Sequence, residues 1–214
     1  MRLMDGLSDQ HRKSFEINLP YLLIVEGEDD YKFFESFLRC LKMTNIQIFC
    51  LRGKNNLNDI LKTLKNTPGF DRLKSIGIVR DANFSPERSF QSVQSALSNA
   101  DLPVPDEEMK PAGQELKVFV LLVPGINEIG SLEDLCLRAV ANDIAISCVD
   151  SYLKCLQKKK IKFQRNLSKA RVQAFLASRE EYIPNLGIAA QKAIWPFDSS
   201  AFNKIREFLK SICI

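Results

Sequence analysis

The chain has 214 residues, of which 45% are hydrophobic and 26% charged, with nine Gly and nine Pro. This is a globular composition, because it is too apolar for a disordered protein and too poor in Gly and Pro for a fibrous one. Thirty Lys and Arg against 26 Asp and Glu give a net charge of +4, which by itself does not indicate a nucleic-acid partner.

Four strands are predicted in chain order, each followed by a helix. The expected strands are 21–25, 45–51, 73–79 and 116–123, and the expected helices are 28–42, 55–65, 86–99 and 131–141. Residues 101–113 contain three Pro and four acids and are expected to form an exposed loop. The rest of the chain is expected to be helical, over 144–159, 167–180 and 199–212.

The alternation of strand and helix predicts an α/β fold of the Rossmann-like, three-layer kind. It should have a mainly parallel sheet of about four strands, flanked by helices. We expect a single domain over 1–214, with a core at about 20–142 and a helical C-terminal elaboration at about 143–214. Ligands of such sheets bind beyond the carboxyl ends of the strands, so the residues that follow each strand are the candidate functional residues.

The sequence also bears on location and on cysteine chemistry. No apolar stretch approaches the ~20 residues that span a bilayer, and the polar N-terminus lacks the apolar core of a secretory signal. A cytoplasmic protein with no membrane partner is therefore expected. The six cysteines form no C-x-x-C pair and mostly lie among Leu, Ile and Phe, which favours buried free thiols over disulfides or a structural zinc. The lone His11 excludes sites that need two histidines.

Acidic and amide side chains follow three of the four predicted strands. They are Glu26 and Asp30 after the first, Asp81 and Asn83 after the third, and Glu133 and Asp134 beyond the loop after the fourth. Mg²⁺ prefers oxygen ligands and usually takes one or two carboxylates plus waters. Each motif also has a purely structural explanation, as acids at a helix start, a capping box that begins at Ser131, or turn residues. Because converging carboxylates repel one another, their joint placement at one edge favours a cation site.

Basic residues predict a second kind of contact. No acid occurs between Ser151 and Arg179, and this stretch can follow the phosphates of DNA or RNA with salt-sensitive binding. The candidate phosphate-binding residues there are Lys158, Lys159, Lys160, Arg165, Lys169 and Arg171. The alternative is a solvated helical face whose acidic partners lie elsewhere in the fold.

Two further motifs have competing explanations. Gly53 and Lys54, in the turn after the second strand, either hold a phosphate at a helix N-terminus or form a plain turn. Trp195, with Pro196 and Phe197, is expected to pack in the core rather than to stack on a base.

These motifs resemble the Toprim domain, the metal-dependent fold of topoisomerases, DnaG-type primases and OLD-family nucleases. The likeness lies in Val25-Glu26-Gly27 before an acidic helix start, and in an Asp-x-Asp-like pair that begins at Asp81 after a later strand. Within that group the chain resembles the small stand-alone Toprim-like proteins of the DUF3226 type. The similar segments are 25–30, 81–83, 124–135 and 195–208, and the likeness spans about 21–209.

The resemblance implies a Mg²⁺ (or Mn²⁺) dependent phosphodiesterase or nuclease that acts on nucleic acid. Glu26 matches the glutamate that serves as general acid or base, and Asp81 matches the first aspartate of D-x-D, so these two would be catalytic. The metal site would comprise Glu26, Asp30, Asp81, Asn83, Glu133 and Asp134. Asn83 stands where the pattern has its second aspartate, and the lost charge should weaken cation binding.

Two other functions remain open. One is a non-catalytic Toprim-like module that binds nucleic acid, a nucleotide or a protein, with an ATPase or a DNA-repair enzyme as the partner to consider. The other is a receiver-like signalling domain with Asp81 as phospho-acceptor. The receiver-like domain ranks last, because no strand-borne lysine follows at the far end of the sheet.

Overall fold

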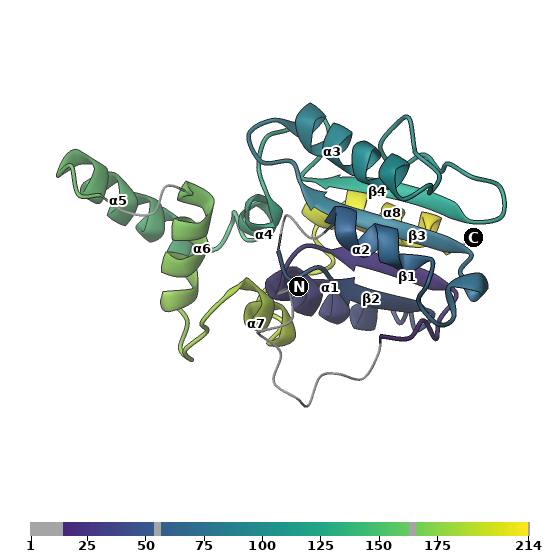
Figure 1. The fold of residues 1–214 in the computed structure, drawn as a ribbon. Coiled ribbons are helices and arrows are strands. Elements are labelled where there is room, and N and C mark those ends of the chain that lie inside the picture. The colour runs from purple at the N-terminus through teal and green to yellow at the C-terminus, as the bar shows by residue number, and fades with distance from the viewer. Residues whose placement is uncertain (1–14, 54–56, 163–165, 214) are drawn as a thin grey trace, which may run out of the picture.

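The computed structural model describes residues 15–53, 57–162 and 166–213, which form an α/β fold (Figure 1). The strands are β1 (Tyr21–Val25), β2 (Ile46–Cys50), β3 (Ser75–Asp81) and β4 (Lys117–Val123). The helices are α1 (Glu28–Cys40), α2 (Leu57–Leu64), α3 (Pro86–Asn99), α4 (Leu132–Ala139), α5 (Ile144–Lys158), α6 (Leu167–Ala177), α7 (Leu186–Gln191) and α8 (Asn203–Ser211), with short 3₁₀ helices η3 (Phe70–Arg72) and η4 (Ser200–Phe202).

The four strands form one parallel sheet in the order β2-β1-β3-β4. Tyr21 of β1 lies opposite Ile46 of β2 on one side and opposite Ser75 of β3 on the other. The chain thus builds outward from β1 to β2 and then crosses back to add β3 and β4. The carboxyl ends of β1 and β3 flank this reversal, which is the point where open α/β sheets bind ligands.

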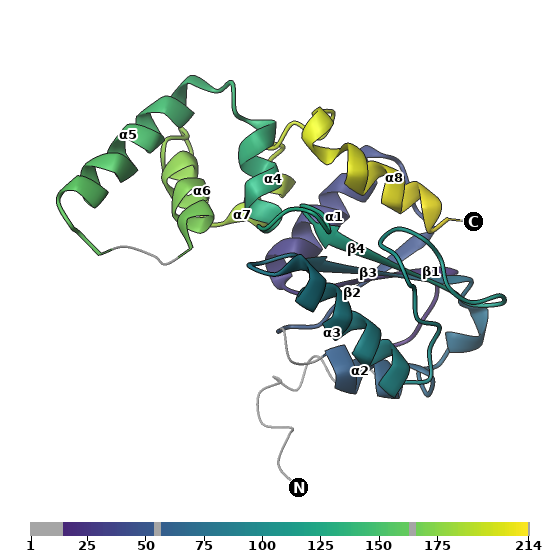
Figure 2. The ribbon, with the colours of Figure 1, turned by 90° about the horizontal axis from the view of Figure 1, so that it is seen from above.

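Helices cover both faces of the sheet, so the predicted three-layer fold is confirmed (Figure 2). Along β1, Leu22 and Ile24 join the core beneath α2 and α3, while Leu23 and Val25 join the core beneath α1 and α8. This alternation follows from the period of two in a strand, and it explains why β1 is apolar throughout.

Helix α8 packs closely on the sheet because β3 carries a glycine. A Cβ at Gly77 would lie 3.1 Å from the ring of Phe208 and 3.2 Å from Ile212. The hydroxyl of Ser75, two residues before Gly77 on the same face of β3, donates a hydrogen bond to the carbonyl of Ile212. The C-terminal helix is therefore part of the core layer that covers β1 and β3.

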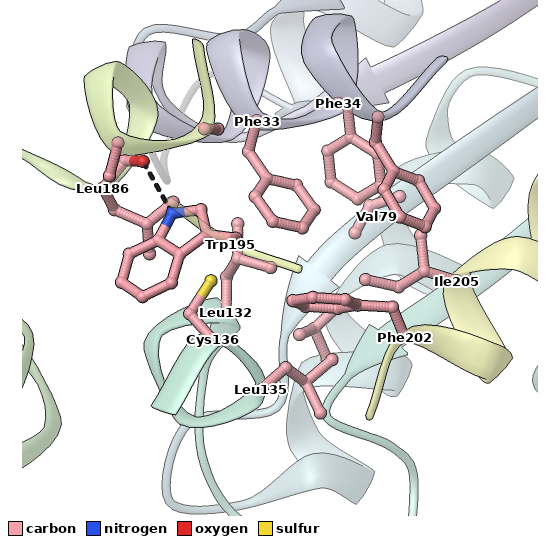
Figure 3. Close-up of a cluster of buried hydrophobic side chains, with 14 of the residues drawn as sticks. Phe33, Phe34, Val79, Leu132, Leu135, Cys136, Leu186, Trp195, Phe202 and Ile205 are labelled. Atoms are coloured by element: carbon pink, nitrogen blue, oxygen red, sulfur yellow. Dashed lines mark hydrogen bonds between the residues drawn. The ribbon is translucent and has the colours of Figure 1, made fainter. Parts of the chain in front are cut away.

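Helices α5 and α6 pack on each other and extend away from the sheet (Figures 1 and 2). Trp195 links this pair to the body. It is 1% exposed, and its Nε1 donates a hydrogen bond to the carbonyl of Leu186 at 3.0 Å (Figure 3). Its ring stacks on that of Phe175 of α6, with 5.9 Å between the ring centroids. The prediction that Trp195 packs in the core is confirmed.

The predicted exposed loop at 101–113 is wrong in part. Leu102 is buried, and the Glu108 side chain is only 6% exposed. The Glu108 carboxylate accepts hydrogen bonds from the amides of Leu122 and Ile126 and pairs with Lys204 Nζ at 2.7 Å. The loop lies along β4, the last strand in the sheet order, whose outer backbone groups need partners.

Other boundaries also differ from those expected. Strand β3 begins and ends two residues later than predicted, so Asp81 is its last residue, and α7 was not predicted.

All six cysteines are free thiols, but of them only Cys136 is buried, whereas Cys40, Cys148 and Cys155 are exposed. The prediction of mostly buried thiols is therefore wrong: Cys148 and Cys155 lie on exposed positions of α5, and Cys40 is the last residue of α1. Among the described helices, none is long and apolar enough to cross a membrane.

Candidate functional site

The acids predicted at the strand ends line one cavity at the carboxyl edge of the sheet. Its volume is about 480 Å³. Its lining includes Glu26, Asp30, Asp81, Asn83 and Glu133 from the predicted metal site, together with Gly53 and Lys169. We call it the acidic cavity. Glu26, Asp30 and Asp81 also border a smaller void of about 10 Å³, which is roughly the space of one water-sized probe.

Backbone amides at helix starts hold two of these carboxylates. Asp81 Oδ1 accepts a hydrogen bond from the amide of Leu132, the first residue of α4, at 3.1 Å. Asp30 Oδ2 accepts one from the amide of Gly27, just before α1, at 2.8 Å. The acids are therefore fixed in place by the same helix termini that follow β1 and β4.

Burial and mutual repulsion change how these acids titrate. Burial is the main factor that raises the pKa of Asp30 to about 6, and the charges of Glu26 and Glu133 raise it further. Burial likewise raises the pKa of Asp81 well above its usual value, with added repulsion from Asp30 and Glu133. Carboxyl groups that resist ionisation together are short of positive charge, a condition that a bound cation relieves.

Two cationic side chains already partner acids of this cavity. Arg80 Nε lies 3.5 Å from Glu26 Oε2, and Lys169 Nζ lies 3.7 Å from Glu133 Oε1. No ion pair involves Asp30 or Asp81 within the described ranges. The positive charge thus reaches Glu26 and Glu133, whereas the carboxylates of Asp30 and Asp81 accept hydrogen bonds from backbone amides.

The donor set suits a hard divalent cation, since the carboxylates and the Asn83 amide are all oxygen ligands. As the side chains stand, no three Asp, Glu, His or Cys residues of the described part are close enough to share an ion directly. Mg²⁺ commonly keeps several waters and takes only one or two carboxylates, so direct contact with three is not required.

Asn83 has a structural function that an aspartate could not fill. Its backbone is left-handed, with φ of 54°, a conformation that Asn tolerates well. Its amide donates to the Gly130 carbonyl at 2.7 Å, and the Gly130 amide donates back at 2.8 Å. Its side-chain Nδ2 donates to the Asp81 carbonyl at 3.0 Å, which a carboxylate cannot do. The departure from D-x-D is thus built into the end of β3.

Asp134 is the predicted ligand that the structure places elsewhere. Its Oδ2 accepts from the Ser131 amide at 2.8 Å, as a capping box requires, and its Oδ1 accepts from Ser168 Oγ at 2.5 Å. It lines a neighbouring hollow rather than the acidic cavity. Gly53 lines the cavity, but its amide donates to the Glu26 carbonyl at 3.2 Å; Lys54 lies outside the described residues.

The basic residues of the acid-free stretch, Ser151 to Arg179, are of two kinds: some pair with acids among the described residues and others do not. Arg171 forms a two-pronged contact with Asp150 at 2.9 and 3.1 Å, and Lys169 contacts Glu133, so for these the acidic partners do lie elsewhere in the fold. By contrast, Lys158, Lys159 and Lys160 are exposed at the end of α5. None of these three forms an ion pair with the described part of the chain. Arg165 lies outside the described residues.

Arg80 is one site residue that the sequence analysis missed. A charged residue at the end of an otherwise apolar strand, next to a candidate catalytic aspartate, was the available signal. Asn166 and Asn185 also line the acidic cavity and were missed, because they come from segments more than 80 residues beyond Asp81.

Comparisons with known proteins give the family of the chain. The family described as a protein of unknown function, DUF3226, matches residues 20–214. Two solved structures of the C-terminal region of the OLD protein of Xanthomonas campestris pv. campestris, phased with mercury and with platinum, are similar to the chain at 17% and 18% identity, each with a TM-score of 0.49. They cover 91% of this chain and 94% and 92% of theirs. No protein with a curated description matches. Since the family match extends over nearly the whole sequence, the chain belongs to the DUF3226 family.

Proposed function

We propose that the acidic cavity binds Mg²⁺ or Mn²⁺ and that the protein is a phosphodiesterase of nucleic acid with a Toprim-like site. The supporting observation is that Glu26, Asp30, Asp81 and Glu133 line one cavity at the carboxyl edge of the sheet. The raised pKa values of Asp30 and Asp81 add to this, because acids that repel one another in a buried place gain most from a divalent cation.

Each residue of the cavity has a distinct role in this proposal. Asp30 and Asp81 would hold the cation, with Asn83 and Glu133 beside them in the same lining. A divalent cation bound there would supply positive charge to the phosphate oxygens and help to ionise a water. Glu26 would move a proton as general acid or base, while Arg80 orients its carboxylate. Lys169 would meet the phosphate from the α6 side.

A non-catalytic module is the second candidate, and the Arg80–Glu26 pair favours it. The Glu26 carboxylate is already engaged with the Arg80 guanidinium, 3.5 Å away, which suits a structural ion pair better than a carboxylate held ready for proton transfer. The neutral Asn83 further limits the charge available to a cation. Such a module would bind metal and nucleic acid through the same cavity without cleaving.

Cleavage assays separate the two candidates. Supercoiled plasmid, circular single-stranded DNA and a short RNA would each be incubated with Mg²⁺ or Mn²⁺ at several concentrations. If the protein is an enzyme, the wild type should cleave and Asp81→Asn should not. Asp71→Asn, which replaces an exposed carboxylate of η3, should cleave as the wild type does. If the wild type binds the ions but cleaves no substrate, the non-catalytic module is supported and the phosphodiesterase proposal is wrong.

A further inference from the structure

A second hollow adjoins the acidic cavity, and its rim is apolar. Its volume is about 240 Å³. Three large apolar side chains on its lining are exposed to solvent: Phe84 at 90%, Ile129 at 65% and Leu167 at 43%. Single exposed apolar residues are common on proteins, but several around one hollow mark a binding surface. We call this feature the apolar-rimmed hollow.

The lining of the hollow also has polar groups in a fixed arrangement. Asp134 accepts hydrogen bonds from Ser131 and from Ser168, which ties the start of α4 to the start of α6. Asn83 and Asn166 line both this hollow and the acidic cavity, so the two spaces adjoin at these residues. A ligand that fills both would place an apolar part near Phe84 and a charged part near Asp81.

The backbone places the rim residues together. Asn83 and Gly130 exchange two amide–carbonyl hydrogen bonds, which join the loop after β3 to the loop before α4. Phe84 follows Asn83 and Ile129 precedes Gly130, so the two side chains flank one bridged pair. Leu167, the first residue of α6, completes the rim. The rim is therefore held by a backbone bridge and a helix start.

We propose that the apolar-rimmed hollow binds one unpaired nucleobase of single-stranded nucleic acid, whose neighbouring phosphate lies in the acidic cavity. A base has two apolar faces and a polar edge, which matches an exposed apolar rim that carries one aromatic ring, Phe84, around fixed polar groups. Within a duplex, neighbouring bases cover both faces of every internal base, so an internal base can stack on Phe84 only when it is unpaired. This inference rests on the proposed function and deepens it, because it specifies single strands as the substrate class.

The test uses a labelled twelve-nucleotide DNA strand and the blunt duplex of the same sequence, with binding measured by fluorescence anisotropy in Mg²⁺. Phe84→Ala should weaken binding of the single strand about tenfold, within the range for loss of one base stacked on an aromatic ring. Phe84→Trp should retain the affinity, because it keeps an aromatic face. Duplex binding should change in neither variant.

Tyr182→Ala is the matched control. Tyr182 is 87% exposed and lines neither the hollow nor the acidic cavity, so its loss should leave single-strand binding unchanged. Because Phe84 is 90% exposed, Phe84→Ala should also melt at the wild-type temperature, which separates a binding effect from misfolding. A set of strands that carry 2-aminopurine at successive positions should show which base stacks on Phe84. The fluorescence of that base should be quenched by the wild type and not by Phe84→Ala.

These experiments distinguish failure of the nucleobase site from failure of the phosphodiesterase proposal. If no variant or wild type cleaves, but Phe84→Ala specifically weakens the single strand, the phosphodiesterase proposal fails and the nucleobase site stands. If the wild type cleaves and Phe84→Ala binds and cleaves single strands as well as the wild type, the nucleobase site is overturned while the enzyme stands. Failure of the wild type to bind the single strand also overturns it.

Discussion

Arg80 Nε lies 3.5 Å from Oε2 of Glu26, and each of these side chains is only 12% exposed. Glu26 is the first residue after β1 and Arg80 is the last but one of β3, so the pair joins two adjacent strands at the edge where the acidic cavity opens. Removing one member of a nearly buried ion pair leaves the other charge uncompensated. The proposed proton carrier is therefore also a structural residue.

Glu26→Gln should lower the free energy of unfolding of the metal-free protein by about 2–4 kcal/mol, because the Arg80 guanidinium loses its counter-charge. Adding Arg80→Met in the same chain should recover much of this loss, since both charges are then gone. Urea unfolding of the two single variants and the double variant measures the coupling. Additive effects of the two substitutions would show that the pair contributes nothing.

Asp30→Asn should stabilise the metal-free protein at pH 7. The pKa of Asp30 is raised to about 6 in the folded chain, so the folded state holds this proton more tightly than the unfolded state does. Stability from this group is full below about pH 4 and is lost as the pH rises to about 6. Asparagine cannot ionise and still accepts the Gly27 amide, so it should gain roughly 1–3 kcal/mol at pH 7.

The same comparison at about pH 4 should show almost no difference, since the carboxyl is then protonated in the native state. Asp71→Asn, which changes an exposed carboxylate of η3, is the control and should shift stability little at either pH. If Asp30→Asn is less stable than the wild type at pH 7, the carboxylate is stabilised by its surroundings and the account of its raised pKa is wrong.

Lys204→Met should destabilise the protein by about 1–3 kcal/mol, because it leaves the carboxylate of Glu108 without its counter-ion. Glu108 is 6% exposed and Lys204 is 35% exposed, which places the expected effect below that of a fully buried pair. Lys210→Met, on an exposed position of the same helix α8, should have little effect. Equal melting temperatures for the two variants would contradict the proposed tie between the 101–113 loop and α8.

Nucleic-acid affinity, where it is present, should depend on the three exposed lysines that end α5. Replacing Lys158, Lys159 and Lys160 by Glu should weaken binding and reduce the slope of log affinity against log salt, because fewer counterions are released. Anisotropy titrations at several salt concentrations measure both quantities.

A charge-matched control replaces Lys62, Arg72 and Lys74, which are exposed on other elements, by Glu. This control should keep the wild-type salt slope, apart from a small general loss of affinity. If both triple variants behave alike, the α5 lysines act only through net charge and form no phosphate contact of their own.

The sequence predicts the local features of this structure well and its long-range contacts poorly. Apolar runs such as 21–25 and 116–123, and the acids just beyond them, set the strands and the edge where Glu26 and Asp81 meet. Which way a side chain turns was not predictable, since Asp134 faces Ser168 across 34 residues of sequence. The pairing of Arg171 with Asp150 and the burial of Glu108 likewise depend on packing between distant segments. Domain limits and metal ligation stay predictions.

Manganese binding to the acidic cavity is the central claim, and titration of Mn²⁺ followed by electron paramagnetic resonance tests it directly. The wild type should bind the ion saturably at pH 7.5, Asp81→Asn should bind far less, and wild-type binding should fall toward pH 5 as protons compete for Asp30 and Asp81. Asp71→Asn should bind as the wild type does. Absence of binding at millimolar Mn²⁺, or equal binding by wild type and Asp81→Asn, would contradict the account.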